Sequence, residues 1–207
     1  MTKDPKVGIV DHNYANIHSV KKALDFLGCK SLIINDPKEL EFLDGIVLPG
    51  VGAFDSAMKR LNEVGFTEKI KEVAKGGMPI IGVCMGMQLL FNKSQEGSLE
   101  GMGLIDGEVT KIDVGLEKLK IPHIGWNKTH KNRKSALMEN VNDREYFYYV
   151  HGFKCEPTDK SIISSHTVYG EEICSSIETE NIFATQFHPE KSGTKGLEIY
   201  KNFINGL

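Results

Sequence analysis

The chain has 207 residues, of which 40% are hydrophobic and 26% charged, and this size and balance predict one globular domain covering residues 1–207. The formal net charge of −3 provides no basic field, so we expect neither a nucleic-acid partner nor attachment to an anionic membrane. The four cysteines, at positions 29, 84, 155 and 174, lack the paired spacing of a metal site or a secreted disulfide framework, and we expect a cytoplasmic protein with reduced thiols.

The first half of the chain alternates short apolar runs with amphipathic stretches. The N-terminal apolar run is too short for a signal peptide or a membrane span. We predict strands at 6–11, 31–35, 45–50 and 79–84, and helices at 16–28, 53–65, 66–77 and 85–94. Strands that alternate with helices predict βαβ units, and therefore a largely parallel sheet with helices on both faces.

The second half of the chain is richer in β-forming residues separated by turn residues. We predict extended segments at 103–113, 146–155, 161–170 and 181–189, an exposed polar loop at 128–135, and a closing helix at 193–205. These segments predict a mixed or antiparallel extension of the sheet. The expected fold is therefore α/β, a single three-layer domain with a largely parallel central sheet flanked by helices and a mixed or antiparallel extension.

A cysteine stands at the turn between a predicted strand and a predicted helix. Residues 82–86 are Gly-Val-Cys-Met-Gly, the pattern of a nucleophile elbow with Cys84 in the place often taken by serine. Such a turn strains the apex residue and brings backbone segments close together, so its flanking residues must be small. A following helix directs free N–H groups at the sulfur, which favours the thiolate. On this pattern alone, a buried structural cysteine is about as plausible as a nucleophile.

Two further segments carry groups that a cysteine nucleophile needs. In "ATQFHPEKS" (184–192), His188 and Glu190 follow a β-like run and could form a base and the carboxylate that orients it. In "LPGVGAF" (48–54), a glycine-rich turn could present backbone N–H groups to a developing negative charge. Taken separately, a solvated surface loop and an ordinary strand-to-helix loop are the commoner interpretations of these two segments.

The three segments together resemble the class I (triad) glutamine amidotransferases, in order and in separation. The resemblance implies that Cys84 is the nucleophile, that His188 is general base and then general acid, and that Glu190 orients His188. It implies an oxyanion hole made by the turn of Gly50, Val51 and Gly52 and by the N–H of Met85. It also implies that Gln88 and Glu96 hold the substrate L-glutamine, with no cofactor and no metal. By contrast, we expect substitutions of His151 and His166 to be tolerated.

The resemblance narrows to one branch of that family. The segments "IPHIGWN" (121–127), "YFYYVHGF" (146–153) and "ATQFHPEKSG" are similar to the glutaminase subunits of imidazole glycerol phosphate synthases, over essentially the full chain. This implies a heterodimer with a (β/α)₈-barrel cyclase, to which ammonia is channelled for histidine biosynthesis. The implied partner contacts are Asp11, Asn16, Trp126 and Lys191.

One segment departs from the pattern of that branch. Its members usually have Asp-Tyr-Gly-x-Gly-Asn after the first strand, whereas this chain has "DHNYAN" (11–16), with both glycines replaced. The departure leaves open a related system in which the same glutaminase chemistry supplies ammonia for amidation of a surface-polysaccharide sugar. A hydrolase acting alone and a catalytically inactive binding subunit are further alternatives. Retention of Cys84, His188 and Glu190 speaks against the inactive subunit.

Overall fold

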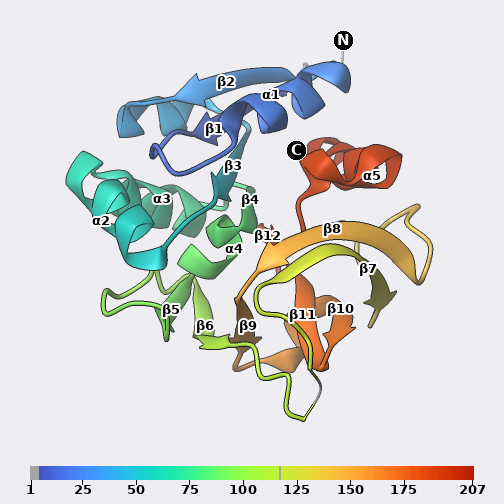
Figure 1. The fold of residues 1–207 in the computed structure, drawn as a ribbon. Helices are drawn as coiled ribbons and strands as arrows, with labels where there is room; N and C mark the ends of the chain where they lie inside the picture. The colour runs from blue at the N-terminus through green and yellow to red at the C-terminus, as the bar shows by residue number, and fades with distance from the viewer. Residues whose placement is uncertain (1–4, 117) are drawn as a thin grey trace.

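The parallel strands predicted in the first half form the centre of the fold in a computed structural model that describes residues 5–116 and 118–207 (Figure 1). The remaining residues of the predicted domain, 1–4 and 117, lie outside the described part. The parallel strands lie in the order β2, β1, β3, β4, β12. Their bounds are β1 (Lys6–Val10), β2 (Lys30–Ile34), β3 (Gly45–Gly50), β4 (Ile80–Cys84) and β12 (Ile182–Thr185).

Four antiparallel strands continue the same sheet beyond β12, which confirms the predicted extension. They follow in the order β11 (Glu171–Glu178), β10 (Ile163–Tyr169), β7 (His123–Lys131) and β8 (Glu145–His151). The loop predicted at 128–135 is wrong for its first four residues, because Lys128 pairs with Tyr146 and His130 with His166 in this sheet. Polar composition did not reveal these residues as a strand, since their partners come from distant parts of the chain.

A separate three-stranded sheet consists of β5 (Phe91–Ser94), β6 (Ile105–Lys111) and β9 (Phe153–Pro157). The helix predicted at 85–94 is therefore wrong in its second half. The helix α4 spans only Met85–Leu89, and Phe91 then pairs with Ile105 of β6. Pairing with a distant strand replaces the helix here, because the backbone groups of 91–94 pair with β6, which begins eleven residues further along the chain.

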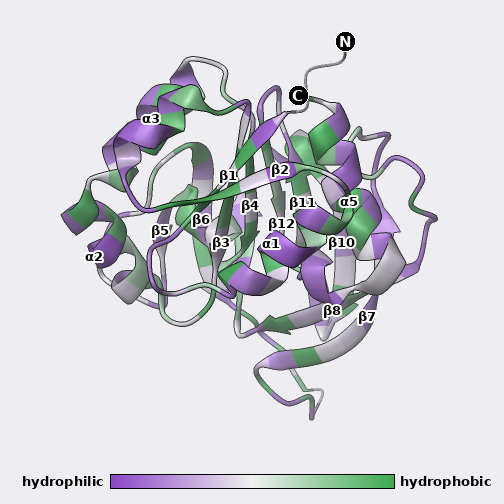
Figure 2. Ribbon diagram, turned by 90° about the horizontal axis from the view of Figure 1, so that it is seen from above, coloured by the Kyte–Doolittle hydropathy of each residue, from purple (hydrophilic) through white to green (hydrophobic). Residues whose placement is uncertain are grey.

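Helices cover both faces of the central sheet and give the predicted three layers. The helices α2 (Phe54–Val64) and α3 (Phe66–Lys75) lie on one side of the parallel strands, and α1 (Ile17–Phe26) and α5 (Gly193–Asn205) on the other (Figure 2). Each helix buries an apolar stripe at helical spacing; in α1 this stripe is Ile17, Val20, Ala23 and Leu24. Two separate apolar clusters form on the two sides of the sheet.

Three short 3₁₀ helices complete the described secondary structure: η1 (Pro37–Phe42), η2 (Lys160–Ile162) and η3 (Pro189–Lys191). In the described part of the chain, no helix combines the length and the apolar character needed to cross a bilayer. The element that matters most for the site is η3, because it immediately follows His188 and begins the turn that leads from β12 into α5.

Candidate active site

The three segments singled out in the sequence meet at the carboxyl edge of the parallel strands. Gly50 at the end of β3 pairs with Cys84 at the end of β4, and Val83 pairs with Thr185 at the end of β12. His188 follows three residues after Thr185. Because neighbouring parallel strands end at the same edge, the glycine-rich turn, the cysteine and the histidine are brought to one place, the usual location of sites in such sheets.

The backbone at Cys84 has the strained conformation expected of an elbow. Its φ is 55° and its ψ is −109°, a region that a residue with a side chain rarely occupies. The flanking glycines are required by close approach. A Cβ on Gly86 would lie 1.7 Å from the carbonyl oxygen of Leu48, and a Cβ on Gly82 would lie 2.8 Å from that of Gly86. The elbow is therefore packed directly against β3 and against its own helix.

A cavity of about 370 Å³ opens beside Cys84. It is lined by Val51, Gly52, Cys84, Met85, Gln88, Glu96, Pro122, Val150, His151, Gly152, Phe153 and Lys191. Cys84 itself is only 5% exposed, and its Sγ lies 3.8 Å from the carbonyl oxygen of Val150. Because α4 has only five residues, its dipole supports the sulfur less than the longer predicted helix would have done.

His188 and Glu190 lie side by side, as their spacing allowed. The Nδ1 atom of His188 is 2.8 Å from Oε1 of Glu190, and both side chains are 2% exposed. The second carboxylate oxygen accepts a hydrogen bond of 3.3 Å from the hydroxyl of Tyr200 in α5. This role of Tyr200 was not predictable from the sequence, in which the residue only occupies one position of an apolar helix face. The carboxylate is thus fixed at both oxygens.

The other ring nitrogen of His188 is available for chemistry. Its Nε2 atom is buried and has no hydrogen-bond partner among the described residues. Burial opposes protonation of this ring, but the charge of Cys84 and a side-chain interaction with its sulfur, together with the hydrogen bond to Glu190 and the charge of that carboxylate, outweigh it and raise the pKa of His188 to about 10. The contact with the sulfur falls outside the geometric limits of a hydrogen bond, so Nε2 counts as unpartnered. An unpartnered nitrogen beside a thiol, on a ring held by a carboxylate, is the arrangement of a nucleophile and its base.

Residues 11–16 hold the glycine-rich turn in place. The backbone N–H of Val51 donates to the carbonyl oxygen of Tyr14 at 2.7 Å, and Nε2 of His12 lies 2.7 Å from the carbonyl oxygen of Pro49. Val51 and Gly52 line the cavity, and Gly52 has a φ of 96°. The N–H of Val51 is therefore committed to Tyr14 in this structure and is not offered to the cavity.

Gln88 and Glu96 both line the cavity, from different elements. Gln88 lies in α4, and its Oε1 is buried without a hydrogen-bond partner in the described part of the chain. Glu96 follows β5, and its Oε2 accepts a hydrogen bond of 3.0 Å from the backbone N–H of Phe54. Burial raises the pKa of Glu96, an effect that the N–H of Phe54 opposes and the charge of Asp55 reinforces. Both side chains can contact a polar ligand in the cavity.

His151 lines the cavity too, although the sequence pointed away from it. Its Nδ1 lies 2.8 Å from the carbonyl oxygen of Phe153, and its Nε2 lies 3.0 Å from Nδ1 of His123. Burial lowers the pKa of His151 to about 3. Both ring nitrogens are engaged and the ring is neutral, so His151 is less suited than His188 to exchange protons with a ligand.

Of the four residues expected at a partner contact, one lines the cavity, one lies on β7, and two lie in the segment 11–16 that contacts the glycine-rich turn. Lys191 lines the cavity, with its Nζ 5.7 Å from the centre of the Tyr148 ring. Trp126 packs edge-on against the same ring and is 55% exposed. Asp11 accepts a hydrogen bond from the backbone N–H of Asn13, and Asn16 precedes α1.

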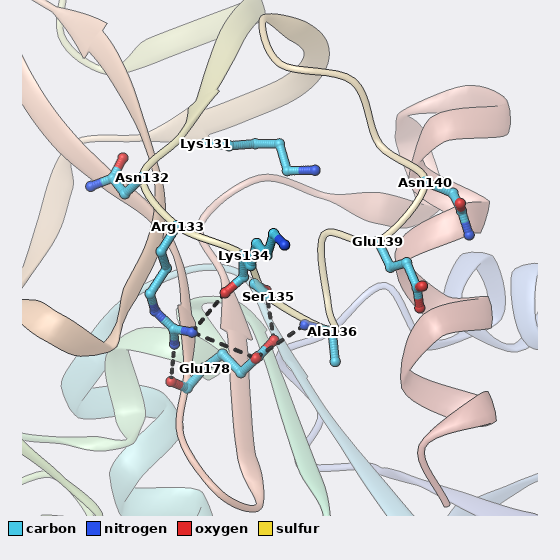
Figure 3. Close-up of a pocket in the computed structure, with 9 residues that line it drawn as sticks. All are labelled: Lys131, Asn132, Arg133, Lys134, Ser135, Ala136, Glu139, Asn140 and Glu178. Atoms are coloured by element: carbon cyan, nitrogen blue, oxygen red, sulfur yellow. Dashed lines mark hydrogen bonds and ion pairs between the residues drawn. The ribbon is translucent and has the colours of Figure 1, made fainter.

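A larger cavity, of about 790 Å³, lies elsewhere, along residues 131–140 and Glu178 (Figure 3). The carboxylate of Glu178 accepts hydrogen bonds from the Ser135 hydroxyl and from the backbone N–H groups of Ala136 and Leu137. These contacts fix a loop, and neither a cysteine nor a histidine lines this cavity. Within residues 5–116 and 118–207, no cluster of three or more His, Cys, Asp or Glu side chains could hold a metal ion. The cavity at Cys84 is therefore the candidate active site.

Comparison with known proteins identifies the family to which the chain belongs. Residues 9–206 match the family described as "Glutamine amidotransferase class-I". The chain belongs to this family. The amidotransferase is 42% identical over 198 residues to a protein of Moorella thermoacetica named "Imidazole glycerol phosphate synthase subunit HisH", covering 95% of this chain and 93% of the relative. It is likewise 42% identical to a protein of the same name from Aquifex aeolicus, covering 94% of each.

Solved structures share the fold of the amidotransferase at lower identity. A structure described as a glutamine amidotransferase superposes with a TM-score of 0.75 at 17% identity, covering 97% of this chain and 99% of the other. The structure of PurLQS from Thermotoga maritima gives a TM-score of 0.75 at 21% identity and covers 99% of both chains. These likenesses confirm the predicted α/β architecture.

Proposed function

We propose that this amidotransferase hydrolyses L-glutamine to glutamate and ammonia, with Cys84, His188 and Glu190 as its catalytic residues. The proposal rests mainly on the environment of His188. Its Nδ1 lies 2.8 Å from Glu190, while its Nε2 is buried, has no hydrogen-bond partner among the described residues, and belongs to a ring whose pKa the nearby Cys84 raises. Membership of the family supports the reaction.

The chemistry follows from these groups. Cys84 gives its thiol proton to His188, and the resulting thiolate attacks the side-chain amide carbon of glutamine, so that the carbonyl oxygen becomes an oxyanion. His188 gives its proton to the departing nitrogen, so that ammonia leaves and a glutamyl thioester remains. His188 then takes a proton from water, which attacks the thioester and releases glutamate and the thiol. Glu190 keeps the ring of His188 oriented and favours its charged form throughout.

The oxyanion needs donors, and the N–H of Val51 is not offered to the cavity in this structure. We assign the oxyanion hole to Gly50, Val51, Gly52 and the N–H of Met85, with Val51 as the donor that must change partner. Its N–H is bonded to Tyr14, and rotation of the adjoining peptide would release it toward the cavity. Gly52 permits such a rotation because it has no Cβ. One lost donor typically costs about 2.7–4 kcal/mol of transition-state stabilisation, or roughly 10²–10³ in rate.

Binding of glutamine falls to groups on the cavity wall. Gln88 presents a buried carbonyl oxygen that lacks a partner within the described residues and can accept an N–H of the substrate. Glu96 presents a carboxylate that can pair with the α-ammonium group of the amino acid. Both residues line the same cavity as Cys84.

The ammonia is passed to a partner subunit. The relatives named "Imidazole glycerol phosphate synthase subunit HisH" support a place in histidine biosynthesis, and they do not favour sugar amidation. From the resemblance of the sequence to the glutaminase subunits of such synthases, we infer a cytoplasmic heterodimer with a (β/α)₈-barrel cyclase. The exposed face of β7 and β8 supports a docking surface beside the cavity, because Ile124, Trp126 and Tyr146 are large, apolar and exposed there. Asp11, Asn16 and Lys191 complete the proposed contact.

Steady-state glutaminase activity tests the proposal. The chain is assayed alone, then with a purified (β/α)₈-barrel cyclase, then with cyclase and an analogue of its acceptor substrate. We expect weak activity alone and an increase of roughly 10²–10³ in the loaded complex. Full activity in the isolated chain, unchanged by either addition, would instead identify a hydrolase that acts alone. Absence of glutamine hydrolysis under all three conditions would contradict the proposed reaction.

A further inference from the structure

A second buried glutamine lies between the cavity wall and the sulfur of Cys84. Gln186 follows β12, two residues before His188, and is 0% exposed. Its backbone N–H donates to the carbonyl oxygen of Ser175 at 2.8 Å, which fixes the main chain. Its side-chain amide reaches both Gln88 and Cys84.

The direction of every hydrogen bond in this group follows from one backbone carbonyl. Nε2 of Gln88 lies 3.3 Å from the carbonyl oxygen of Phe153, and a carbonyl can only accept. The amide nitrogen of Gln88 must therefore point there, and its second hydrogen reaches Oε1 of Gln186 at 3.2 Å. Gln186 consequently turns its own nitrogen toward Cys84, with Nε2 3.7 Å from Sγ.

These bond directions have consequences both at Cys84 and at Gln88, the two ends of the hydrogen-bonded series. At one end, an N–H donor approaches the sulfur from inside the protein, where burial excludes competing water. At the other end, both amide hydrogens of Gln88 are used, and its Oε1 has no partner in the part of the chain that is described. A hydrogen bond from a fixed donor favours the charged form of an acceptor.

We propose that Gln186 is a positioning residue that donates its side-chain N–H to the sulfur of Cys84 and fixes the orientation of the Gln88 amide in the cavity wall. This inference rests on the glutaminase function proposed above. A glutamine that only fills space or satisfies its neighbours would need a partner for its amide but would have no effect on the ionisation of Cys84.

Two variants distinguish the hydrogen bond that Gln186 donates to Cys84 from the one that it accepts from Gln88. Gln186→Glu keeps the acceptor for Gln88 but removes the donor and places a negative charge beside the sulfur. Gln186→Met has a similar shape, carries no charge and can neither donate to Cys84 nor orient Gln88. Gln95→Glu is the matched control, because Oε1 of Gln95 only accepts, from the N–H of Lys111 at 3.1 Å, and a carboxylate can replace it there.

The first measurement is the rate of alkylation of Cys84 by iodoacetamide as a function of pH, with the modified residue identified by mass and Cys84→Ala as the background. It uses the full chain and needs no turnover. We expect Gln186→Glu to move the midpoint of the profile upward by about one pH unit or more, Gln186→Met to move it less in the same direction, and Gln95→Glu to leave it unchanged. Circular dichroism establishes that each variant is folded, and Gln186→Met carries the test if the charged variant is not.

The second measurement is glutamine turnover in the complex with the cyclase. Loss of the donor should lower kcat roughly 10- to 100-fold, and Gln186→Met should also raise KM because Gln88 is released. If folded Gln186 variants keep the wild-type alkylation profile, the proposal is overturned and Gln186 is only structural. If the profile shifts as expected while wild-type protein hydrolyses no glutamine, the inference about the sulfur stands and the proposed function fails.

Discussion

The parallel and the antiparallel halves of the central sheet contribute differently to the candidate active site. The parallel strands β3, β4 and β12 end at one edge and deliver the turn at 50–52, Cys84 and His188. The antiparallel strands supply the opposite wall, including Val150 and His151, and the exposed face that carries Trp126. The groups proposed to react and the wall that surrounds them therefore come from different halves of the sheet, and substitutions in either half test this division.

The largest expected effect is at the apex of the elbow in the parallel half. Cys84→Ala should reduce glutamine turnover by on the order of 10⁴-fold or more, because no other group in the site can form the thioester. A glutamine-analogue electrophile should label this cysteine alone. Burial raises the pKa of Cys155, and that of Cys174 to about 12, which keeps both as unreactive thiols. Cys155→Ser is the control, and labelling at Cys155 with Cys84 untouched would contradict the assignment.

The next substitution compares one histidine from each half. His188→Asn should lower kcat by about 10²–10⁴-fold with little change in glutamine binding, since it removes the acid and base. The loss of kcat in His151→Asn should be smaller than that in His188→Asn by roughly tenfold or more, because both nitrogens of His151 are already bonded within the protein. Steady-state kinetics of the two folded variants provide the test. Equal losses would move the base, or part of its role, to the antiparallel half.

A smaller effect is expected at Glu190, together with a shift in pH dependence. Because the pKa of His188 is raised to about 10, kcat/KM of the wild type should fall only as the pH rises through that value and the ring loses its proton. Glu190→Gln removes a carboxylate that favours the charged ring, so this alkaline limb should move to lower pH. A pH profile of both proteins measures the shift. An unchanged limb would mean that Glu190 does not support the charge of His188.

The smallest effect on chemistry is expected at Trp126 in the antiparallel half. Trp126→Ala should weaken binding of the cyclase by about 2 kcal/mol, roughly 30-fold in Kd, while the alkylation of Cys84 in the isolated chain stays unchanged. Titration calorimetry measures the affinity. Phe42→Ala is the control, because Phe42 is 74% exposed in η1, immediately before β3 and thus at the opposite end of the strands. Equal affinities for the two variants would exclude this face as the docking surface.

The sequence predicted the parallel half well because its signals are local. An apolar run, a glycine-flanked cysteine and a following amphipathic stretch placed β4 and the elbow at Cys84, and the predicted family and fold are confirmed. The strand β11 (Glu171–Glu178) was missed, because its buried serines lack an apolar pattern and bond with serines of β10. Residues 91–94 were assigned to a helix, because their partner strand β6 is set by tertiary pairing.

Side-chain direction was the other part that sequence could not supply. Gln186 stood within a segment already chosen for His188 and Glu190, but no local pattern tells which atoms an amide faces. The same holds for Tyr200, whose apolar helix face gave no sign that its hydroxyl reaches Glu190. The roles assigned to Cys84, His188 and Glu190, to the turn at 50–52 and to Gln88 and Glu96 stay predictions until the measurements above are made.

The backbone contacts of the segment around His188 also protect the edge strand β8 of the sheet. The strand β8 ends the strand order, and an unpaired edge strand is a template for aggregation through strand addition. At Tyr148, in the middle of β8, the backbone N–H donates to the Ser192 hydroxyl at 3.0 Å and the carbonyl oxygen accepts from the N–H of His188 at 2.9 Å. The two bonds that position the histidine segment therefore also block a foreign strand at this residue, so solubility and catalysis depend on the same short stretch of chain.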